Sequence, residues 1–361
     1  MNSPFVPAPD YENLVKSARN QWVARVPLYD HLVDIAKIEE MTGTEVGEPM
    51  RAPGAADRRE GFRRYWAFFR DMGYDAAPFE CCITSALVNG GALGAHKEGC
   101  IKTRADFERY PWAEIEELFF SAFAPMFETL RETCPPGMKA VGGVGNGVFE
   151  IVQDLVGYIN LCFLRADDGE LYADLFRRVS DLIYGIWTRF LPAWGDAFCV
   201  LRMGDDLGFR SSTLLSREDL LTHVFPCYRR VVYLAHASGK PFLLHSCGNL
   251  LSVFDELIDE TGIDAKHSNE DAIAAFPAWV ERFGGRIGNF GGLDVNDLCL
   301  KSGAEIRARV FDCLDRIRAI PHRGGVAFGS GNSIPQYVPA AGYLAMTEAV
   351  REWRGDAAAH A

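Results

Sequence analysis

The sequence has few cationic residues for its length of 361, with 37 Lys and Arg against 49 Asp and Glu and a formal net charge of −12. Nucleic acids and anionic membrane surfaces bind through basic patches, so neither is expected as a main partner. No apolar stretch approaches the roughly 20 residues of a membrane-spanning helix. The N-terminus also lacks the basic and apolar regions of a signal peptide. We therefore expect a cytoplasmic protein.

Two nucleotide-binding motifs are missing as well. There is no GxxxxGK[ST] phosphate loop, and no acidic residue ends a second strand about 20 residues after the glycine-rich VGGVGNG at 141–147. A dinucleotide-binding fold is therefore excluded. The ten cysteines are irregularly spaced in a long chain, which favours free thiols over a disulfide framework.

Short apolar, β-rich runs alternate with helical segments over most of the chain. From about residue 136 each run ends in a cluster of Gly, Asp, Asn or His, and the runs cover 138–145, 197–206, 241–249, 262–268, 286–295 and 324–332. This order is typical of βαβ units in an α/β fold with a parallel sheet. Two further runs, 25–31 and 79–87, bring the strand count to eight and predict a (β/α)8 TIM barrel. The helical segment 1–75 is expected to form an N-terminal extension packed on a barrel that spans 76–361.

Polar residues gather where these strands are predicted to end, and in such a barrel the active site lies at the carboxyl ends of the strands. The residues are Asn146, Glu150, Asp205, Asp206, His245, Cys247, Asn249, His267, Ser268, Glu270, Asp271, Asp294, Ser330 and Asn332. Asp205, Asn249 and Ser268 are equally good helix caps or turn formers. Taken together, the set predicts a polar, acidic and metal-capable mouth.

His245 and Cys247 stand two positions apart at the end of an apolar run. On an extended segment, side chains at i and i+2 point to the same side, so one ion can reach both. Imidazole and thiolate are zinc ligands, and a catalytic zinc has three protein ligands and one open position. The sequence leaves the third ligand open between Glu150 and His267. The alternative is an ordinary strand end with two reactive side chains.

Four segments resemble the uroporphyrinogen decarboxylase-like superfamily, namely GDDLG, HSCGN, GGLDV and GSGNSIPQYVP. The resemblance covers residues 136–350 and implies a (β/α)8 barrel. One branch of the superfamily comprises decarboxylases that use no metal and hold the carboxylates of the substrate with arginines from an N-terminal motif. Here the segment 25–40 keeps Arg25 and a proline but lacks the second arginine. Decarboxylation of a tetrapyrrole is therefore the alternative to the main interpretation.

The other branch comprises methyltransferases that work with corrinoid proteins and bind zinc through an H-x-C…C pattern. His245 and Cys247 match the first two ligands, whereas Asn332 stands where the third cysteine is expected. The resemblance implies a zinc-assisted demethylase, which moves a methyl group from a small methoxy- or methylamine-type substrate to a corrinoid (cobalamin) on a partner protein. A barrel that binds a corrinoid or tetrapyrrole without catalysis is a second alternative.

On this interpretation the polar residues have distinct expected roles. Catalytic residues would be Asp205, Asp206, Glu270 and Asn332, substrate-binding residues would be Asn146, Arg210, Asn249, His267, Asp294 and Ser330, and metal ligands would be His245, Cys247 and Glu150. Glu270 could take the place of zinc in polarising the heteroatom, and Arg210 could hold a substrate carboxylate. The expected partners are the methyl donor and the corrinoid protein, with a homodimer as one possible assembly.

Overall fold

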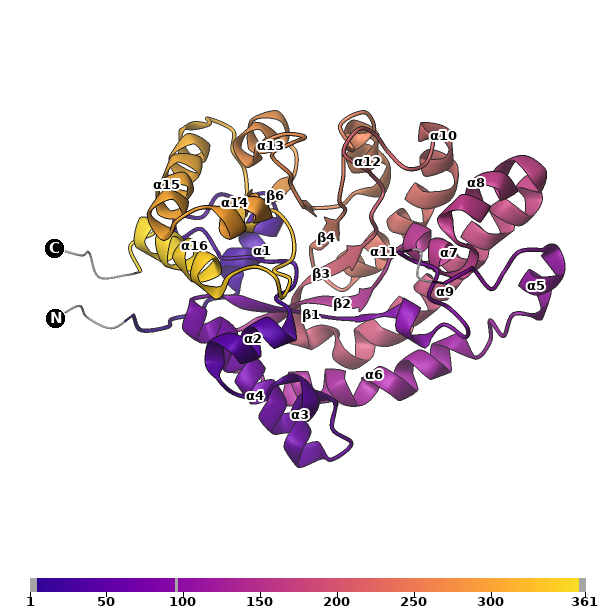
Figure 1. Cartoon of the computed structure of the whole chain (residues 1–361), viewed down its shortest axis with the longest axis horizontal. Coiled ribbons are helices and arrows are strands. Elements are labelled where there is room, and N and C mark those ends of the chain that lie inside the picture. Colours follow the sequence, from indigo (N-terminus) through magenta and orange to yellow (C-terminus); the bar gives the residue numbers. More distant parts are fainter. Residues whose placement is uncertain (1–4, 95–96, 357–361) are drawn as a thin grey trace.

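Seven parallel strands form one sheet in which each strand pairs with the next along the chain. The computed structural model describes residues 5–94 and 97–356 (Figure 1). The strands are β1 (Ala76–Cys82), β2 (Lys139–Gly145), β3 (Phe198–Gly204), β4 (Phe242–His245), β5 (Ala265–His267), β6 (Gly288–Leu293) and β7 (Val326–Ser330). Helices connect the strands around the outside of the curled sheet, which confirms the predicted TIM-barrel architecture.

Helices precede the sheet and separate its strands. Before β1 lie α1 (Glu12–Ala18), α2 (Ile35–Thr42), α3 (Gly47–Arg51) and α4 (Ala55–Met72); after β1, α5 (Arg104–Arg109) and α6 (Ile115–Glu132); after β2, α7 (Val148–Val156), α8 (Tyr158–Asp167) and α9 (Gly169–Trp194); after β3, α10 (Arg217–Asp219) and α11 (Phe225–Ala237); after β4, α12 (Phe254–Thr261); after β5, α13 (Phe276–Phe283); after β6, α14 (Val295–Leu300) and α15 (Gly303–Ala319); after β7, α16 (Ala340–Trp353). Within the described ranges, none of these helices has the length and apolar character needed to cross a membrane. All ten cysteines are free thiols.

Residues 27–34 lie beside β7, where an eighth strand would close the sheet, and they pair with the chain there through two isolated bridges. At the bridge between Leu28 and Phe328, the N–H of Phe328 donates to the carbonyl oxygen of Pro27, and the N–H of Tyr29 donates to the carbonyl oxygen of Phe328. Farther along β7, the N–H of Ser330 is accepted by the Asp30 side chain instead of a backbone carbonyl. A side chain thus interrupts the ladder, and the eighth strand predicted near the N-terminus is reduced to bridges.

Helix α1 closes the amino end of the barrel. It contacts β3, β6 and β7, and its Leu14 and Ala18 belong to the apolar cluster that fills the barrel together with residues such as Leu243. The chain entering β7 comes very close to this helix, because a Cβ on Gly325 would lie 1.9 Å from the carbonyl oxygen of Ser17. Only glycine allows that approach. The amino end is therefore packed shut, and the functional site is to be sought at the carboxyl end.

The segment before β1 packs directly on the barrel. Helix α4 contacts α6 and β1, and it buries one face that includes Phe62, Trp66 and Phe69. The Tyr65 hydroxyl of the same helix donates to the carbonyl oxygen of Pro78 in β1. Helices α1 and α4 and the bridged residues 27–34 thus tie the extension to the sheet.

Candidate metal centre at the barrel mouth

A pocket of about 320 Å³ opens at the carboxyl ends of the strands. It is lined by His31, Leu32, Glu80, Leu93, Asn146, Glu150, Gly204, Asp206, His245, Cys247, Asn332 and Ser333. A larger hollow, of about 960 Å³, lies between α8 and residues 92–94 and 97–104, but no histidine or cysteine of the described chain lines it. The smaller pocket, which combines imidazole, thiol and carboxyl groups, is therefore the candidate site.

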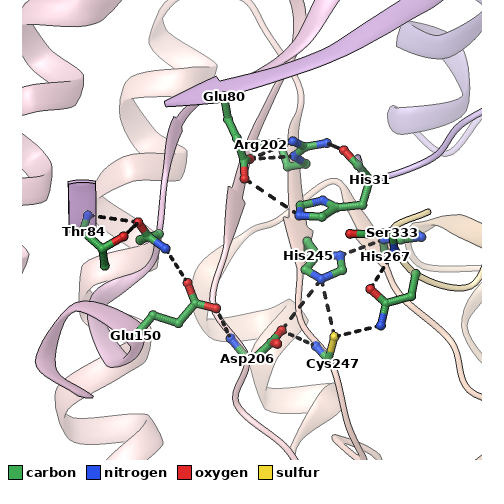
Figure 2. A network of polar contacts seen from close by, with 12 residues as sticks. His31, Glu80, Thr84, Glu150, Arg202, Asp206, His245, Cys247, His267 and Ser333 are labelled. Atoms are coloured by element: carbon green, nitrogen blue, oxygen red, sulfur yellow. Dashed lines mark hydrogen bonds and ion pairs between the residues drawn. The ribbon is translucent and has the colours of Figure 1, made fainter. Parts of the chain in front are cut away.

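Asp206, His245 and Cys247 bring three different ligand atoms together on one wall of the pocket (Figure 2), and we call them the ligand triad. The Nε2 of His245 lies 3.5 Å from the Sγ of Cys247 and 3.8 Å from Oδ1 of Asp206. Strand register explains the meeting, because His245 pairs with Gly204 at the end of β3 and Asp206 follows two residues later. The Cys247 backbone N–H donates to Oδ1 of Asp206 at 2.8 Å, which fixes the carboxylate beside the thiol.

A second group of possible ligands, His31, His245 and His267, is unsuited to a single metal ion. The His31 and His245 rings are stacked, with centroids 3.6 Å apart and planes 14° from parallel. The nitrogen lone pairs lie in the ring plane, so an ion in the plane of one ring lies well outside the plane of the other. The Nδ1 atoms of His245 and His267 are already hydrogen-bonded at 2.8 Å. The ligand triad is the better metal site of the two.

Asn332 holds the thiol of Cys247 from the far side of the triad. Its Nδ2 donates to Sγ at 3.4 Å, while its Oδ1 accepts the Ser333 N–H at 2.8 Å, which fixes the direction of the amide. Burial raises the pKa of the Cys247 thiol, and the Asp206 carboxylate raises it further. A cation between the Cys247 thiol and the Asp206 carboxylate would lower the pKa of the thiol, because a metal ion binds the thiolate form.

Glu150 lies across the pocket, outside the ligand triad (Figure 2). Its Oε2 accepts from Nδ2 of Asn146 at 2.8 Å, and its Oε1 accepts from the Asp206 backbone N–H at 3.2 Å. Burial raises the pKa of the Glu150 carboxyl well above its usual value, and the nearby carboxylates of Asp205 and Asp206 add to the effect. The geometry therefore favours Asp206 over Glu150 as the third ligand.

Asp205 is fully buried and does not line the pocket, although it adjoins Asp206. Its carboxylate accepts from the backbone N–H groups of Phe149 and Glu150 and from the Tyr228 hydroxyl. Burial raises the pKa of this carboxyl to about 7 despite the three hydrogen bonds. Asp205 thus holds the start of α7 against the end of β3, and positions Glu150 rather than a substrate.

Residues 67–353 match the family model described as uroporphyrinogen decarboxylase (URO-D). The chain belongs to this family. Among solved structures, a methyltransferase from Methanosarcina mazei is similar with a TM-score of 0.73 at 15% identity, and the match covers 94% of this chain and 98% of that one. The likeness shows a shared fold.

Other solved structures are more distant. A xylose isomerase-like TIM barrel protein from Mycobacterium smegmatis matches at 12% identity and a TM-score of 0.38, over 92% of this chain and 99% of that one. A glycoside hydrolase family 5 enzyme from Prevotella bryantii matches at 10% identity and a TM-score of 0.43, over 96% and 100%. No curated protein matches this URO-D family member significantly.

Arg25 lies at the amino end of this URO-D barrel, opposite the pocket. Its guanidinium pairs with Asp75, the residue directly before β1, at 2.6 Å, and with Asp356 at 2.8 Å. Within the described chain, no lysine or arginine lines the pocket. The arginine that the decarboxylase resemblance singles out is therefore occupied in ion pairs away from the mouth.

Four further predicted site residues lie outside the pocket lining. Arg210 is exposed on the loop after β3. The side chain of Asn249 accepts the Leu251 N–H in a turn, and the side chain of Asp294 caps α14. Glu270 is half-buried on the loop after β5. Asn249 and Asp294 thus take the turn and cap roles that polar residues commonly have at strand ends.

His267 and Ser330 lie behind the pocket, where both are fully buried. Nδ1 of His267 is 2.8 Å from Nδ1 of His245, and its Nε2 is 3.2 Å from the backbone carbonyl oxygen of Ser330. Burial lowers the pKa of His267 to about 3. Neither residue lines the pocket, whereas Asn146 does.

Three residues at the pocket escape sequence reasoning: His31, Glu80 and Arg202. Arg202 is fully buried in the barrel and donates to Oε2 of Glu80 from Nε at 3.1 Å and Nη2 at 2.7 Å. Its Nη1 donates to the backbone carbonyl oxygen of His31 at 2.6 Å. The signal that could have found the pair is one acidic and one basic residue, each alone inside a predicted apolar strand, because such charges need a buried partner.

Proposed function

We propose that this URO-D family member is a corrinoid-dependent methyltransferase of the demethylase type. It would take a methyl group from a small methoxy- or methylamine-type donor and pass it to Co(I) of a corrinoid on a partner protein. Zinc would be held by Asp206, His245 and Cys247. The observation that carries the proposal is the ligand triad, whose nitrogen, sulfur and oxygen atoms all lie within 4.8 Å of one another at the mouth of the pocket.

The donor set fits zinc. Zinc bonds to imidazole, thiolate and carboxylate of about 2.0–2.3 Å at tetrahedral angles put neighbouring ligand atoms about 3.3–3.8 Å apart. The separation from His245 Nε2 to Cys247 Sγ, 3.5 Å, matches a nitrogen–sulfur pair, and Asp206 Oδ1 at 3.8 Å from Nε2 lies a few tenths of an ångström beyond the separation of a nitrogen–oxygen pair. Three protein ligands also leave a fourth position open, as in catalytic zinc sites. When bound, zinc would supply Lewis acidity to the heteroatom that carries the methyl group.

The remaining lining residues suit a small donor without several negative charges. Leu32 and Leu93 offer apolar surface, while Asn146, Glu150 and Ser333 offer polar groups around the open side of the ligand triad. A volume of about 320 Å³ lies at the lower end of the range for ligand pockets. A tetrapyrrole with many carboxylates would find neither room nor a cationic partner in this lining, which favours methyl transfer over decarboxylation.

Zinc content and methyl transfer test the proposal. Purified protein is expected to carry stoichiometric zinc and to methylate cob(I)alamin from at least one of methanol, methyl ethers or methylamines. The His245→Ala/Cys247→Ala double variant should lose both properties. Cys162→Ser, which changes an exposed cysteine on α8, is the matched control and should lose neither.

Three results would point elsewhere. Metal-free protein that converts uroporphyrinogen to coproporphyrinogen would identify a decarboxylase. Protein that binds cobalamin but transfers no methyl group from any of these donors would indicate a carrier. Zinc bound equally well by the double variant would remove the ligand triad as the metal site.

A further inference from the structure

His245, in the wall of the pocket, contacts the buried His267 behind it, and a dashed line marks this contact in Figure 2. His245 ends β4 and His267 ends β5, and the two residues are register partners. Their Nδ1 atoms are 2.8 Å apart. Two nitrogens at this distance share a single proton, because two bare atoms repel through their lone pairs and two N–H groups repel through their hydrogens. One ring is therefore the donor and the other the acceptor.

The second nitrogen of His267 decides which ring donates. Its Nε2 lies 3.2 Å from the backbone carbonyl oxygen of Ser330, and a carbonyl can only accept. His267 therefore carries its proton on Nε2. A neutral imidazole has one proton, which leaves Nδ1 of His267 bare. The donor in the pair is then Nδ1 of His245.

A doubly protonated His267 would reverse this direction, and the surroundings of the ring disfavour that cation. The ring is fully buried, and its hydrogen-bond partners within the described chain are a carbonyl and an imidazole, with no carboxylate among them. Arg202 adds a fixed positive charge to the same barrel interior. A buried charge without a counter-charge is strongly unfavourable. His267 is therefore the neutral tautomer protonated on Nε2.

The accepting carbonyl is itself held in place from behind. The N–H of Ser330 donates to Oδ1 of Asp30 at 2.8 Å, and its hydroxyl donates to the same oxygen at 2.6 Å. The Tyr74 hydroxyl donates to the other oxygen of Asp30. All three residues are buried. The N–H of Gly331, which belongs to the same peptide group as the accepting carbonyl, donates to the carbonyl oxygen of Leu293 at 2.6 Å, so the direction of the acceptor for His267 is fixed by the fold.

We infer that His267 is a positioning residue, which holds His245 as its Nδ1–H tautomer and leaves Nε2 of His245 bare toward Cys247 and Asp206. The other tautomer would put a hydrogen atom where the ligand triad needs a lone pair. Metal-ligating histidines generally donate their second N–H to a neighbouring acceptor, and loss of such a partner typically costs 10- to 100-fold in metal affinity. The inference rests on the proposed function only in taking the bare nitrogen to be a metal ligand.

Proton positions in the unmodified, metal-free protein give the first test. NMR of protein with isotope-labelled histidine is expected to show His245 protonated on Nδ1 and His267 on Nε2. A proton on Nε2 of His245 would overturn the inference, even in a protein that binds zinc. The expected tautomers in a protein that binds no zinc would support the inference and overturn the proposed function, so the two failures are distinct.

Zinc affinity of variants gives the second test. His267→Phe keeps a ring of similar size but removes the acceptor, and the zinc dissociation constant is expected to rise about 10- to 100-fold. His267→Gln offers both an acceptor and a donor and should recover most of the affinity. His223→Phe, which alters a histidine packed on Tyr172 and Phe176 outside the pocket lining, is the matched control for metal affinity. An unchanged dissociation constant in folded His267→Phe protein would overturn the inference.

Discussion

The amino and carboxyl ends of this barrel differ in how their charged side chains are paired. At the amino end, Arg25 pairs with Asp75 and Asp356, and Arg354 pairs with the same Asp356 at 2.6 Å. Arg354 also donates to the backbone carbonyl of Val26, so the cluster ties both ends of the chain to the start of β1. Here each charge has a partner of opposite sign, so removal of one partner would leave a buried charge uncompensated.

At the carboxyl end, charges of the same sign are crowded together. Glu150 and Asp206 face one pocket, and no cation lines it within the described chain. The thiol of Cys247 lies directly beside the Asp206 carboxylate. Such groups destabilise the fold when nothing is bound, and perturbed clusters of this kind mark functional sites. The charges of the cluster at the closed end are thus paired, whereas among the carboxylates that line the pocket Glu80 is paired with Arg202, but Glu150 and Asp206 have no lysine or arginine beside them in the described chain.

Asp206→Asn is expected to have the largest effect on zinc affinity, because it removes one of the two unpaired carboxylates at the open end. The amide keeps an oxygen for the Cys247 N–H but loses the charge of a zinc ligand. We expect the zinc dissociation constant to rise by more than about 100-fold, since partners outside the ligand set already contribute about 10- to 100-fold. The melting temperature of metal-free protein should stay the same or rise, because repulsion with Glu150 is relieved. Metal competition titrations and thermal unfolding measure the two quantities.

The control for this change is Asp168→Asn at the N-cap of α9, where asparagine caps as well as aspartate. It should alter neither zinc affinity nor stability. If Asp206→Asn instead lowered the melting temperature and left zinc affinity intact, the carboxylate would be a structural group and the contrast between the ends would fail.

Arg25→Met, at the closed end, is expected to lower stability and to leave zinc affinity unchanged, which is the reverse of the effect expected for Asp206→Asn. It leaves the buried carboxylate of Asp75 without its ion pair, and Arg25 itself is only 26% exposed. We expect a loss of about 1–3 kcal/mol in the free energy of unfolding, with zinc affinity unchanged. Urea unfolding measures the loss. Arg59→Met removes the exposed ion pair with Glu132 and should change stability by less than about 1 kcal/mol. Equal losses in both variants would argue against a special role for the closed end.

The fold was predictable because six apolar runs from residue 136 on each end in Gly, Asp, Asn or His, and each of them contains a strand; the run at 79–87 overlaps β1, which begins earlier and ends at Cys82. The eighth, near Leu28, was predicted from the same pattern, but the Asp30 side chain takes the place of the next ladder hydrogen bond. A local apolar pattern cannot reveal that substitution, since it depends on Ser330, which is 300 residues away in the chain.

The site was predictable only in part. The spacing of His245 and Cys247 placed two ligands on one wall, because side-chain alternation along a strand is a local property. The sequence offers Glu150 or His267 as a third ligand, and that Asp206 lies beside His245 and Cys247 depends on how β3 and β4 are registered, which no local pattern reveals. The buried pair of Glu80 and Arg202 was missed for the same reason, since the two charges meet only across the barrel interior.

The pH dependence of zinc affinity tests the protonation states of Cys247 and His245 at the open end. Burial raises the pKa of the Cys247 thiol, so the metal-free protein holds the thiol form at neutral pH and zinc must displace one proton. Burial lowers the pKa of His245 well below its usual value, so the imidazole releases none. The zinc dissociation constant should therefore fall about tenfold for each pH unit of increase between roughly pH 6 and pH 8. Competition titrations at several pH values measure the slope.

A flat pH profile would mean that the thiolate is already formed without metal, and a slope near two would mean that a second group loses a proton with it. Either result would contradict the charge state inferred for the ligand triad. The matching measurement on Cys247→Ser protein should give much weaker binding without the thiol-linked slope, because the proton that zinc displaces belongs to the thiol.

Asn332→Ala should have the smallest effect, because Asn332 touches the triad through one hydrogen bond. Its Nδ2 donates to the sulfur of Cys247 and favours the thiolate. Loss of one such bond is worth about 0.5–1.5 kcal/mol, so zinc should bind roughly 2- to 10-fold more weakly. Ser333→Ala keeps the backbone N–H that orients Asn332 and serves as the control. Zinc affinity lowered as far as in Asp206→Asn would mean that Asn332 is itself a ligand, and the three-residue site at the open end would have to be redrawn.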